Sequence, residues 1–363
     1  MSTSSNWTVI AQRIVRGLGI KRGELIQVRD DSGRMDILQE VCLAIERQGA
    51  TPMVHLTAVS YMERLWSTAP KSYLETWDSH RQKWLEDTDR ILVLAGADPD
   101  LSQVPDESFW AWREAEHRLT QIEESKQCPY LLAAVPTQRR ADQCNLSLFK
   151  LETVLKDALN VSIADLQRKS GAILNAIGTA KTLHLKTGDD CDCSLHLSSD
   201  RRWHIDDGYI DEQDRQQGAI VSNLPAGSIY TTVLEEKTSG SLFLPQAGEA
   251  RQVRFEFENG RIVDIQADKG ANELNALFDH YSGEPRRVGH IGIGFNPALK
   301  TPIGWTLVDE HVAGYLFISF GENRYMGGQN ESSLNIDFAV PNATLAVNGR
   351  DIIRDGKLRV FSV

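Results

Sequence analysis

The sequence predicts two domains: a parallel-sheet α/β domain over residues 1–180, and a β-rich α+β domain with a cleft over residues 181–363. Three observations support this. The chain has 363 residues, more than one ordinary hydrophobic core holds. Its first half alternates strand-like apolar runs with helical periodicity, the pattern of a parallel sheet covered on both faces. From about residue 182 short β-rich runs replace it.

The first half supplies the elements of the parallel sheet. We expect a helix over residues 35–48, because apolar side chains recur there at helical spacing and Gly49 follows. Four apolar segments are expected to be strands: residues 23–30, 51–57, 90–97 and 129–136.

This sheet lacks the signatures of a nucleotide site. No Gly-x-Gly-x-x-Gly follows the first strand, and no Gly-Lys-Ser/Thr loop is present. The first half is therefore expected to be a scaffold. Residues 29–34 and 96–100, at the carboxyl ends of two strands, remain an alternative place for a ligand.

Residues 141–178 are expected to be mainly helical and to bridge the two halves. In the second half Asn259-Gly260 lies between alternating apolar residues, which predicts a tight β-hairpin. Residues 271–281 have the clearest helical pattern of this half. The remaining expected strands are residues 182–187, 193–198, 228–233, 240–245 and 253–267.

Composition excludes several classes of protein. The net charge is −11 and there is no basic stripe, which argues against binding to nucleic acid. No apolar run approaches the roughly 20 residues of a membrane span. The first ten residues lack a signal-peptide pattern, so we expect a cytoplasmic protein. The five cysteines are scattered, unlike those of a disulfide framework or a zinc ribbon.

The candidate site residues lie in glycine-rich segments of the second half, residues 223–245, 289–300 and 321–340. His290 opens a run of small residues that leaves room around its imidazole. Asn335 and Asp337 are two apart on an expected strand, so both side chains share one face. Leu334, Ile336 and Phe338 would then face the core.

Other polar and aromatic groups are secondary candidates. Glu310 and His311 are adjacent in VDEHVAGYLF. Glu235 and Glu236 precede Lys237 in an expected hairpin, where a solvated turn is the simpler interpretation. Four aromatic residues are expected either to pack in the core or to form pocket walls: Trp305, Tyr315, Phe317 and Phe320.

Five segments carry a resemblance to a known family: NLPAGSIYT, HIGIGFNP, DEHVAGYLFISFG, MGGQNESSLNIDF and VNGRDIIRDGK, together spanning about residues 220–357. They resemble the thermophilic leucyl aminopeptidase (aminopeptidase T-type) superfamily. Within it they are closer to the ring-cleaving 2,5-dihydroxypyridine 5,6-dioxygenase branch. The resemblance implies an α/β domain joined to a β-rich domain, and usually a homodimer.

The resemblance also implies metal ligands. In the aminopeptidase pattern glutamates would stand at Ser228 and His290, and histidines near Phe317 and at Asn335, so that only Asp337 and Glu310 remain as ligands of two metal ions. The dioxygenase pattern fits better. It has a histidine matching His290 and a His-x-Asp pair, of which this chain keeps Asp337 and has Asn335 in place of the histidine.

Four functional hypotheses remain open. The first is a mononuclear metal enzyme on a small polar cyclic substrate, as in the catabolism of aromatic compounds. Its ligands would be His290, Asp337, Asn335 and Glu310, and its metal Fe(II), with Mn or Zn as alternatives.

The second is a metal-free hydrolase or isomerase. His290 would be its general base, Asp337 would orient His290, and Ser228 or Asn335 would stabilise an oxyanion. The others are an aminopeptidase-like metallohydrolase and a non-catalytic binding protein.

Overall fold

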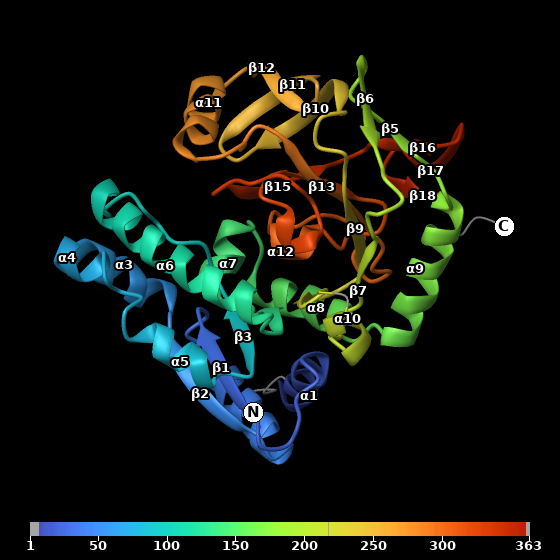
Figure 1. The fold of residues 1–363 in the computed structure, drawn as a ribbon. Coiled ribbons are helices and arrows are strands. Elements are labelled where there is room, and N and C mark those ends of the chain that lie inside the picture. The colour runs from blue at the N-terminus through green and yellow to red at the C-terminus, as the bar shows by residue number, and fades with distance from the viewer. Residues whose placement is uncertain (1–6, 217, 361–363) are drawn as a thin grey trace. The chain divides into compact units, whose positions relative to one another are not determined.

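The computed structural model describes residues 7–216 and 218–360 (Figure 1). The chain divides into two compact units. Unit 1 comprises Met1–Asn160 and Gly208–Pro225, and unit 2 comprises Val161–Asp207 and Ala226–Val363. The sequence pattern places a single boundary near residue 180. In the structure the first crossing lies near residue 160, and residues 208–225 return to unit 1.

Unit 1 is the expected parallel α/β domain. Its five strands are all parallel, in the order β2-β1-β3-β4-β8. The four expected strands are confirmed, whereas β8, supplied by the returning segment, was not expected. The elements are α1 (Trp7–Gly17), β1 (Leu25–Asp30), α2 (Met35–Arg47), β2 (Thr51–Leu56), α3 (Val59–Thr68), α4 (Lys71–Leu74), α5 (Arg81–Asp87), β3 (Arg90–Ala95), α6 (Asp106–Lys126), β4 (Tyr130–Ala134), α7 (Gln138–Gln143), α8 (Leu148–Leu159), α10 (Glu212–Gln216) and β8 (Val221–Leu224).

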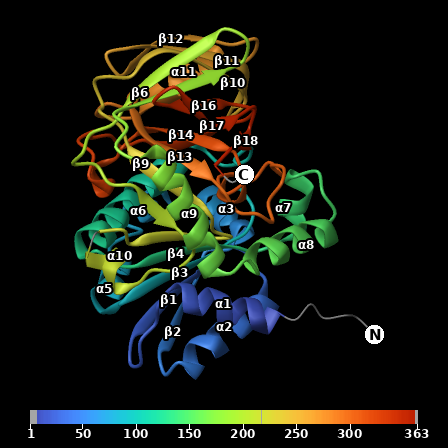
Figure 2. The same cartoon turned by 90° about the vertical axis from the view of Figure 1, so that its right-hand side faces the viewer.

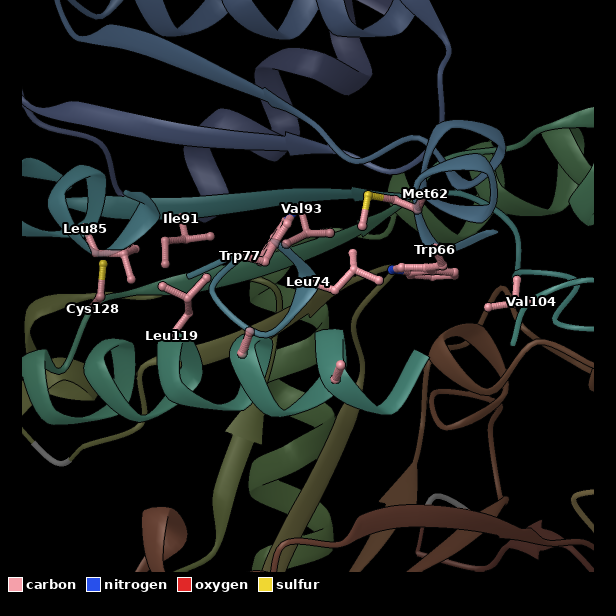
Figure 3. Packing of buried hydrophobic residues seen from close by; sticks show 12 residues of the cluster. Met62, Trp66, Leu74, Trp77, Leu85, Ile91, Val93, Val104, Leu119 and Cys128 are labelled. Carbon is pink, nitrogen blue, oxygen red and sulfur yellow. The ribbon is translucent and has the colours of Figure 1, made fainter. Parts of the chain in front are cut away.

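One face of this sheet is covered by an aromatic-rich core. Ile91 and Val93 of β3 pack in one cluster with Leu119 of α6 and with Trp66 and Trp77 (Figure 3). These side chains are all at least nine-tenths buried. The central strands β3 and β4 are nearly continuous apolar runs, as expected of buried strands in a parallel sheet.

The loops that follow β1 and β3, the alternative ligand position in unit 1, lie close together. A Cβ on Gly96, just after β3, would lie 2.7 Å from Cα of Ser32, just after β1. The Asp30 carboxylate accepts hydrogen bonds from the backbone amides of Ser32 and Gly33 and from the Ser32 hydroxyl. The two loops therefore pack against each other at Gly96 and Ser32, and a ligand at residues 29–34 and 96–100 stays a prediction.

Unit 2 is the expected β-rich domain. It contains an eight-stranded sheet, β12-β11-β10-β6-β5-β16-β17-β18, and a five-stranded sheet, β15-β14-β13-β9-β7. Its elements are α9 (Ile163–Ile177), β5 (Thr182–Thr187), β6 (Cys191–His196), β7 (His204–Asp206), β9 (Ser228–Thr232), β10 (Ser239–Ala247), β11 (Ala250–Glu258), β12 (Arg261–Gln266), α11 (Ala271–His280), β13 (Val288–Gly294), α12 (Thr306–Asp309), β14 (Leu316–Gly321), the 3₁₀ helix η1 (Arg324–Met326), β15 (Asn335–Val340), β16 (Thr344–Val347), β17 (Arg350–Arg354) and β18 (Lys357–Leu358).

Local sequence explains the β11–β12 hairpin. Asn259 and Gly260 both have positive φ, 51° and 77°, which a two-residue type I′ turn requires. The expected hairpin is thus confirmed, and the expected helix at 271–281 is α11. The views of Figures 1 and 2 both show α11 beside β11 and β12.

The five-stranded sheet has one apolar face and one polar face. On the apolar face Phe320 of β14 lies 5.4 Å from Phe255 of β11 and 5.7 Å from Phe278 of α11, measured between ring centroids. This confirms core packing for Phe320. The opposite face carries histidine, tyrosine and carboxylate side chains and is the subject of the next section. Among the helices of the described residues, none is long and apolar enough to cross a membrane.

Candidate active site

The polar face of the five-stranded sheet brings the main sequence candidates together. In the β-ladder His290 of β13 lies opposite Thr232 of β9, and Asp337 of β15 lies opposite Ser319 of β14. Two residues further along β13, Gly292 lies opposite Phe317. Because alternate residues of a strand share a face, all of these positions belong to one face.

Glycine is required in β13 because neighbouring groups occupy the space beside it. A Cβ on Gly292 would lie 1.8 Å from the Phe317 ring, which lies across the strand. A Cβ on Gly294 would lie 2.4 Å from the carbonyl oxygen of Val312 and 2.6 Å from that of Glu310. The small residues after His290 therefore admit an aromatic ring and the 310–312 segment to this face.

His290 and Asp337 make the central contact. Nε2 of His290 lies 3.2 Å from Oδ1 of Asp337, and the His290 residue is only 5% exposed. The two atoms are close enough for a hydrogen bond but do not form one, and Oδ1 has no other hydrogen-bond partner among the described residues. The Asp337 oxygen is therefore buried beside the imidazole without a hydrogen-bond donor among the described residues.

The spacing of this pair fits two neighbouring ligands of one metal ion. Two donors at about 2.1 Å from a metal and at right angles to each other lie about 3.0 Å apart. The unpartnered, mostly buried Oδ1 is the kind of group that a cation would satisfy. Within residues 7–216 and 218–360, however, no group of three or more His, Cys, Asp or Glu side chains is arranged to hold a metal ion. The residues therefore fit one cation held by two side chains, with further positions open.

Asn335 lies on the same strand face but its amide is already engaged. Its Oδ1 accepts a hydrogen bond of 3.0 Å from the Ser319 hydroxyl, and its Nδ2 donates one of 2.9 Å to the Tyr325 hydroxyl. The side chain is exposed. Asn335 is thus on the same face as Asp337, with one lone pair of its amide oxygen already occupied by Ser319.

The charge of Asp337 acts on Glu310, and the structure does not favour Glu310 as an anionic ligand. Burial, together with the charges of Asp337, Asp206 and Asp309, raises the pKa of Glu310 well above its ordinary value. The neutral acid is favoured, and it can donate a hydrogen bond. His311 beside it is fully buried, and burial lowers its pKa to about 3.

Ser228 is placed away from the central pair. It lies opposite Gly294 in the β9–β13 ladder, whereas His290 lies opposite Thr232, four residues further along β9. At about 3.3 Å per residue this corresponds to roughly 13 Å along the strand. Ser228 shares the face with His290, but the structure does not bring it beside the imidazole.

The structure adds two residues that the sequence did not single out. The His204 ring stacks on Tyr230, with centroids 5.2 Å apart and planes inclined by 20°, and Tyr230 lies 5.9 Å from the His290 ring. Burial lowers the pKa of His204. The only local pattern that could have indicated His204 is the alternation of residues 204–206 (His-Ile-Asp) in β7. Three residues are too few to predict a strand.

Glu235 is buried, so the expectation that it lies in a solvated turn is wrong. The residue is 9% exposed, and its carboxylate accepts two hydrogen bonds, of 3.0 and 3.1 Å, from Arg201. It also accepts bonds from Nδ2 of Asn323 and the backbone amide of Gln329. Glu235 therefore anchors the loop of residues 322–330, which carries Tyr325. Glu236 is exposed, as expected.

The family to which this site belongs follows from comparison with known proteins. The family model for "Thermophilic metalloprotease (M29)" matches residues 7–361. The chain belongs to this M29 family. Aminopeptidase T of Thermus aquaticus is 30% identical over 156 residues, and Aminopeptidase AmpS of Bacillus subtilis is 27% identical over 175 residues. These matches cover 37% and 41% of this chain, and 37% and 40% of the respective relatives.

Two solved structures have the same fold as this M29 chain. Wild-type AmpT from Thermus thermophilus matches with a TM-score of 0.77 and 19% identity, over 99% of this chain and 100% of that one. The 2,5-dihydroxypyridine dioxygenase of Pseudomonas putida KT2440 matches with a TM-score of 0.65 and 17% identity, over 99% and 98%. The expected superfamily and fold class are confirmed. Membership of a metalloprotease family points to an enzyme with a metal cofactor, and does not say which metal.

Proposed function

We propose that this chain is a mononuclear metal-dependent enzyme that acts on a small, polar, cyclic substrate, with ring-opening dioxygenase-like chemistry rather than peptide hydrolysis. The contact of Nε2 of His290 with Oδ1 of Asp337, 3.2 Å apart and without a hydrogen bond, carries the proposal. Non-haem Fe(II) oxygenases typically hold their metal with two imidazoles and one carboxylate, of which this pair would supply one imidazole and the carboxylate. Fe(II) is therefore our first choice, ahead of Mn and Zn.

Each residue of the face has a role in this proposal. His290 and Asp337 would hold the metal ion, which when bound would polarise a substrate oxygen or bring dioxygen and substrate together. Phe317 and Tyr230 border the His290 ring and would present aromatic surfaces to a flat substrate. Asn335, linked to Tyr325, offers an exposed amide for a polar substituent.

Peptide hydrolysis by two metal ions has less support. The resemblance implies a metal-binding histidine near Phe317, and the ring there packs edge-on against His290, with centroids 5.9 Å apart. A phenyl ring cannot bind a metal ion. With Ser228 also in place of a glutamate, too few carboxylates remain to hold two dications.

The metal-free alternative is weakened by the same contact. A histidine base oriented by a carboxylate needs a hydrogen bond between the two side chains, and Oδ1 of Asp337 forms none among the described residues. The other ring nitrogen, Nδ1 of His290, is buried and has no hydrogen-bond partner among the described residues.

The chemistry is tested by two assays on the same anaerobically prepared, Fe(II)-supplemented protein. Uptake of dioxygen is followed with 2,5-dihydroxypyridine and other hydroxylated rings, and release of amine is followed with a leucine anilide. We expect dioxygen uptake that needs Fe(II) and is lost in His290→Ala and Asp337→Ala. Amine release that depends on Zn(II) or Mn(II), or turnover that survives a chelator, would overturn the proposed class of reaction.

A further inference from the structure

A second polar feature of unit 2 lies at the β16–β17–β18 hairpins. Gly349, Arg350, Asp351, Arg354 and Arg359 line a surface hollow of about 490 Å³. Three of these five lining residues are arginines. The chain as a whole has 39 basic and 50 acidic residues, so a cationic hollow is opposite in sign to its average charge.

The carboxylate in the hollow is already neutralised. Asp351 Oδ2 lies 2.7 Å from Nε and 2.6 Å from Nη2 of Arg354. The guanidinium groups of Arg350 and Arg359, by contrast, form no ion pair or hydrogen bond with any described residue, and both side chains are exposed. Three guanidinium groups and one carboxylate give the hollow a local charge of +2. The chain as a whole carries an excess of carboxylates.

The arrangement is held by rigid backbone rather than by flexible loops. Asn348 and Gly349 have φ of 51° and 77°, so a tight turn joins β16 to β17. The β17 strand is bulged at Ile352, which the pairing with β16 skips, and this brings Asp351 and Arg354 to the same face. The backbone amide of Arg359 donates a hydrogen bond to the Ile352 carbonyl, which fixes the position of the Arg359 backbone beside β17.

From this we infer an oxyanion-binding site at the hollow, distinct from the His290–Asp337 pair, that takes a doubly charged phosphate group such as that of a phosphate monoester. Guanidinium groups bind phosphate oxygens through paired, charge-assisted hydrogen bonds. Arg350 and Arg359 would supply these bonds and Arg354 would keep Asp351 from repelling the anion. The +2 charge matches a dianion.

The test is calorimetric titration of the full chain with inorganic phosphate in a chloride buffer of constant ionic strength, with nitrate as the singly charged control. We expect phosphate to bind at one site and nitrate not to bind. In Arg350→Gln/Arg359→Gln phosphate binding should weaken at least about 100-fold, since each lost charge-assisted bond weakens binding about tenfold or more. The matched control Arg168→Gln/Arg254→Gln, with the same charge change at arginines paired to Asp165 and Glu256, should bind as the parent does.

Two results would overturn the inference. The first is the absence of phosphate binding to the parent protein. The second is equal weakening in the control variant, which would show a general charge effect. A thermal melt of each variant confirms that it is folded, and because both arginines are exposed we expect no loss of stability.

Discussion

The ring of Phe317 occupies the space that a side chain on Gly292 would need. A Cβ built on Gly292 lies 1.8 Å from the ring, and the two residues are paired in the β13–β14 ladder. This relationship fixes the aromatic wall beside His290. It also explains why glycine is needed two residues after His290, because a side chain at position 292 would exclude the ring.

Gly292→Ala should therefore destabilise unit 2. The added methyl group forces the Phe317 ring to move, and overpacking of this kind costs about 1–3 kcal/mol. The free energy of unfolding from a denaturant titration measures the effect. Gly171→Ala is the matched control, because nothing lies within 4 Å of its Cβ and it lies inside α9. The control should be neutral or stabilised by up to about 1 kcal/mol, and equal losses in both variants would contradict our account of Gly292.

Glu235→Gln should destabilise the fold and loosen the 322–330 loop. The substitution leaves the Arg201 side chain, 4% exposed, without its charge partner, and breaking a buried pair costs about 3 kcal/mol or more. Hydrogen exchange of the Gln329 amide, which donates to Glu235, should accelerate. Its neighbour is the control: Glu236→Gln should change the stability by less than about 0.5 kcal/mol. A Glu235→Gln protein with unchanged exchange at Gln329 would refute the anchoring role.

Acid should weaken unit 1 through Glu24. Partial burial opposes its ionisation, but the hydrogen bonds and charge of Arg90 and the amide of Lys21 lower the pKa of Glu24 overall. A lowered folded-state pKa stabilises the fold above the unfolded value of about 4.5, and this stabilisation is lost as pH falls through the folded value. Glu24→Gln should lower the free energy of unfolding at pH 7. It should also reduce the decrease in this free energy between about pH 5 and pH 3. Urea unfolding across this range, with the exposed Glu46→Gln as control, measures the slope, and parallel curves for Glu24→Gln and the parent would count against the pair.

Asn335→His should strengthen metal binding. The substitution places an imidazole on the face of β15 that carries Asp337 and replaces an amide that is held by Ser319. We expect Fe(II) or Zn(II) to bind at least about tenfold more tightly, since imidazole is the better ligand for both. Competition titration with a chromophoric chelator measures this change. Thr301→His, which adds a histidine at an exposed position elsewhere, should leave the affinity as it was. Equal gains in the two variants would show that any surface histidine suffices.

The sequence predicted much of the fold because local patterns dominate it. The first four strands of unit 1, the Asn259-Gly260 hairpin and helix α11 each follow from the local sequence pattern or turn chemistry. It did not predict β8, because Val221–Leu224 is short and joins its sheet only through the distant β4. The boundary between the units was missed for the same reason, since a returning segment leaves no mark on local composition.

The candidate site was predictable where strand alternation was enough. Asn335 and Asp337 share a face as expected, and Leu334 and Phe338 are buried. His204 and Tyr230 were missed because they reach the site only through pairing of β7 with β9 and of β9 with β13. The role of Glu235 was also hidden, because the carboxylate is buried by Arg201 and by a loop nearly ninety residues later. Such long-range contacts are not encoded in any local window.

The most direct test of the central claim is the metal stoichiometry of the protein. Chain purified without chelators is reconstituted anaerobically with Fe(II), desalted and subjected to elemental analysis, beside His290→Ala and Asp337→Ala. We predict one metal ion per chain in the parent and nearly none in either variant, with all three proteins folded by circular dichroism. Equal metal content in the parent and the variants, or no bound metal in the parent with Fe(II), Mn(II) or Zn(II), would contradict the proposal that His290 and Asp337 form a metal site.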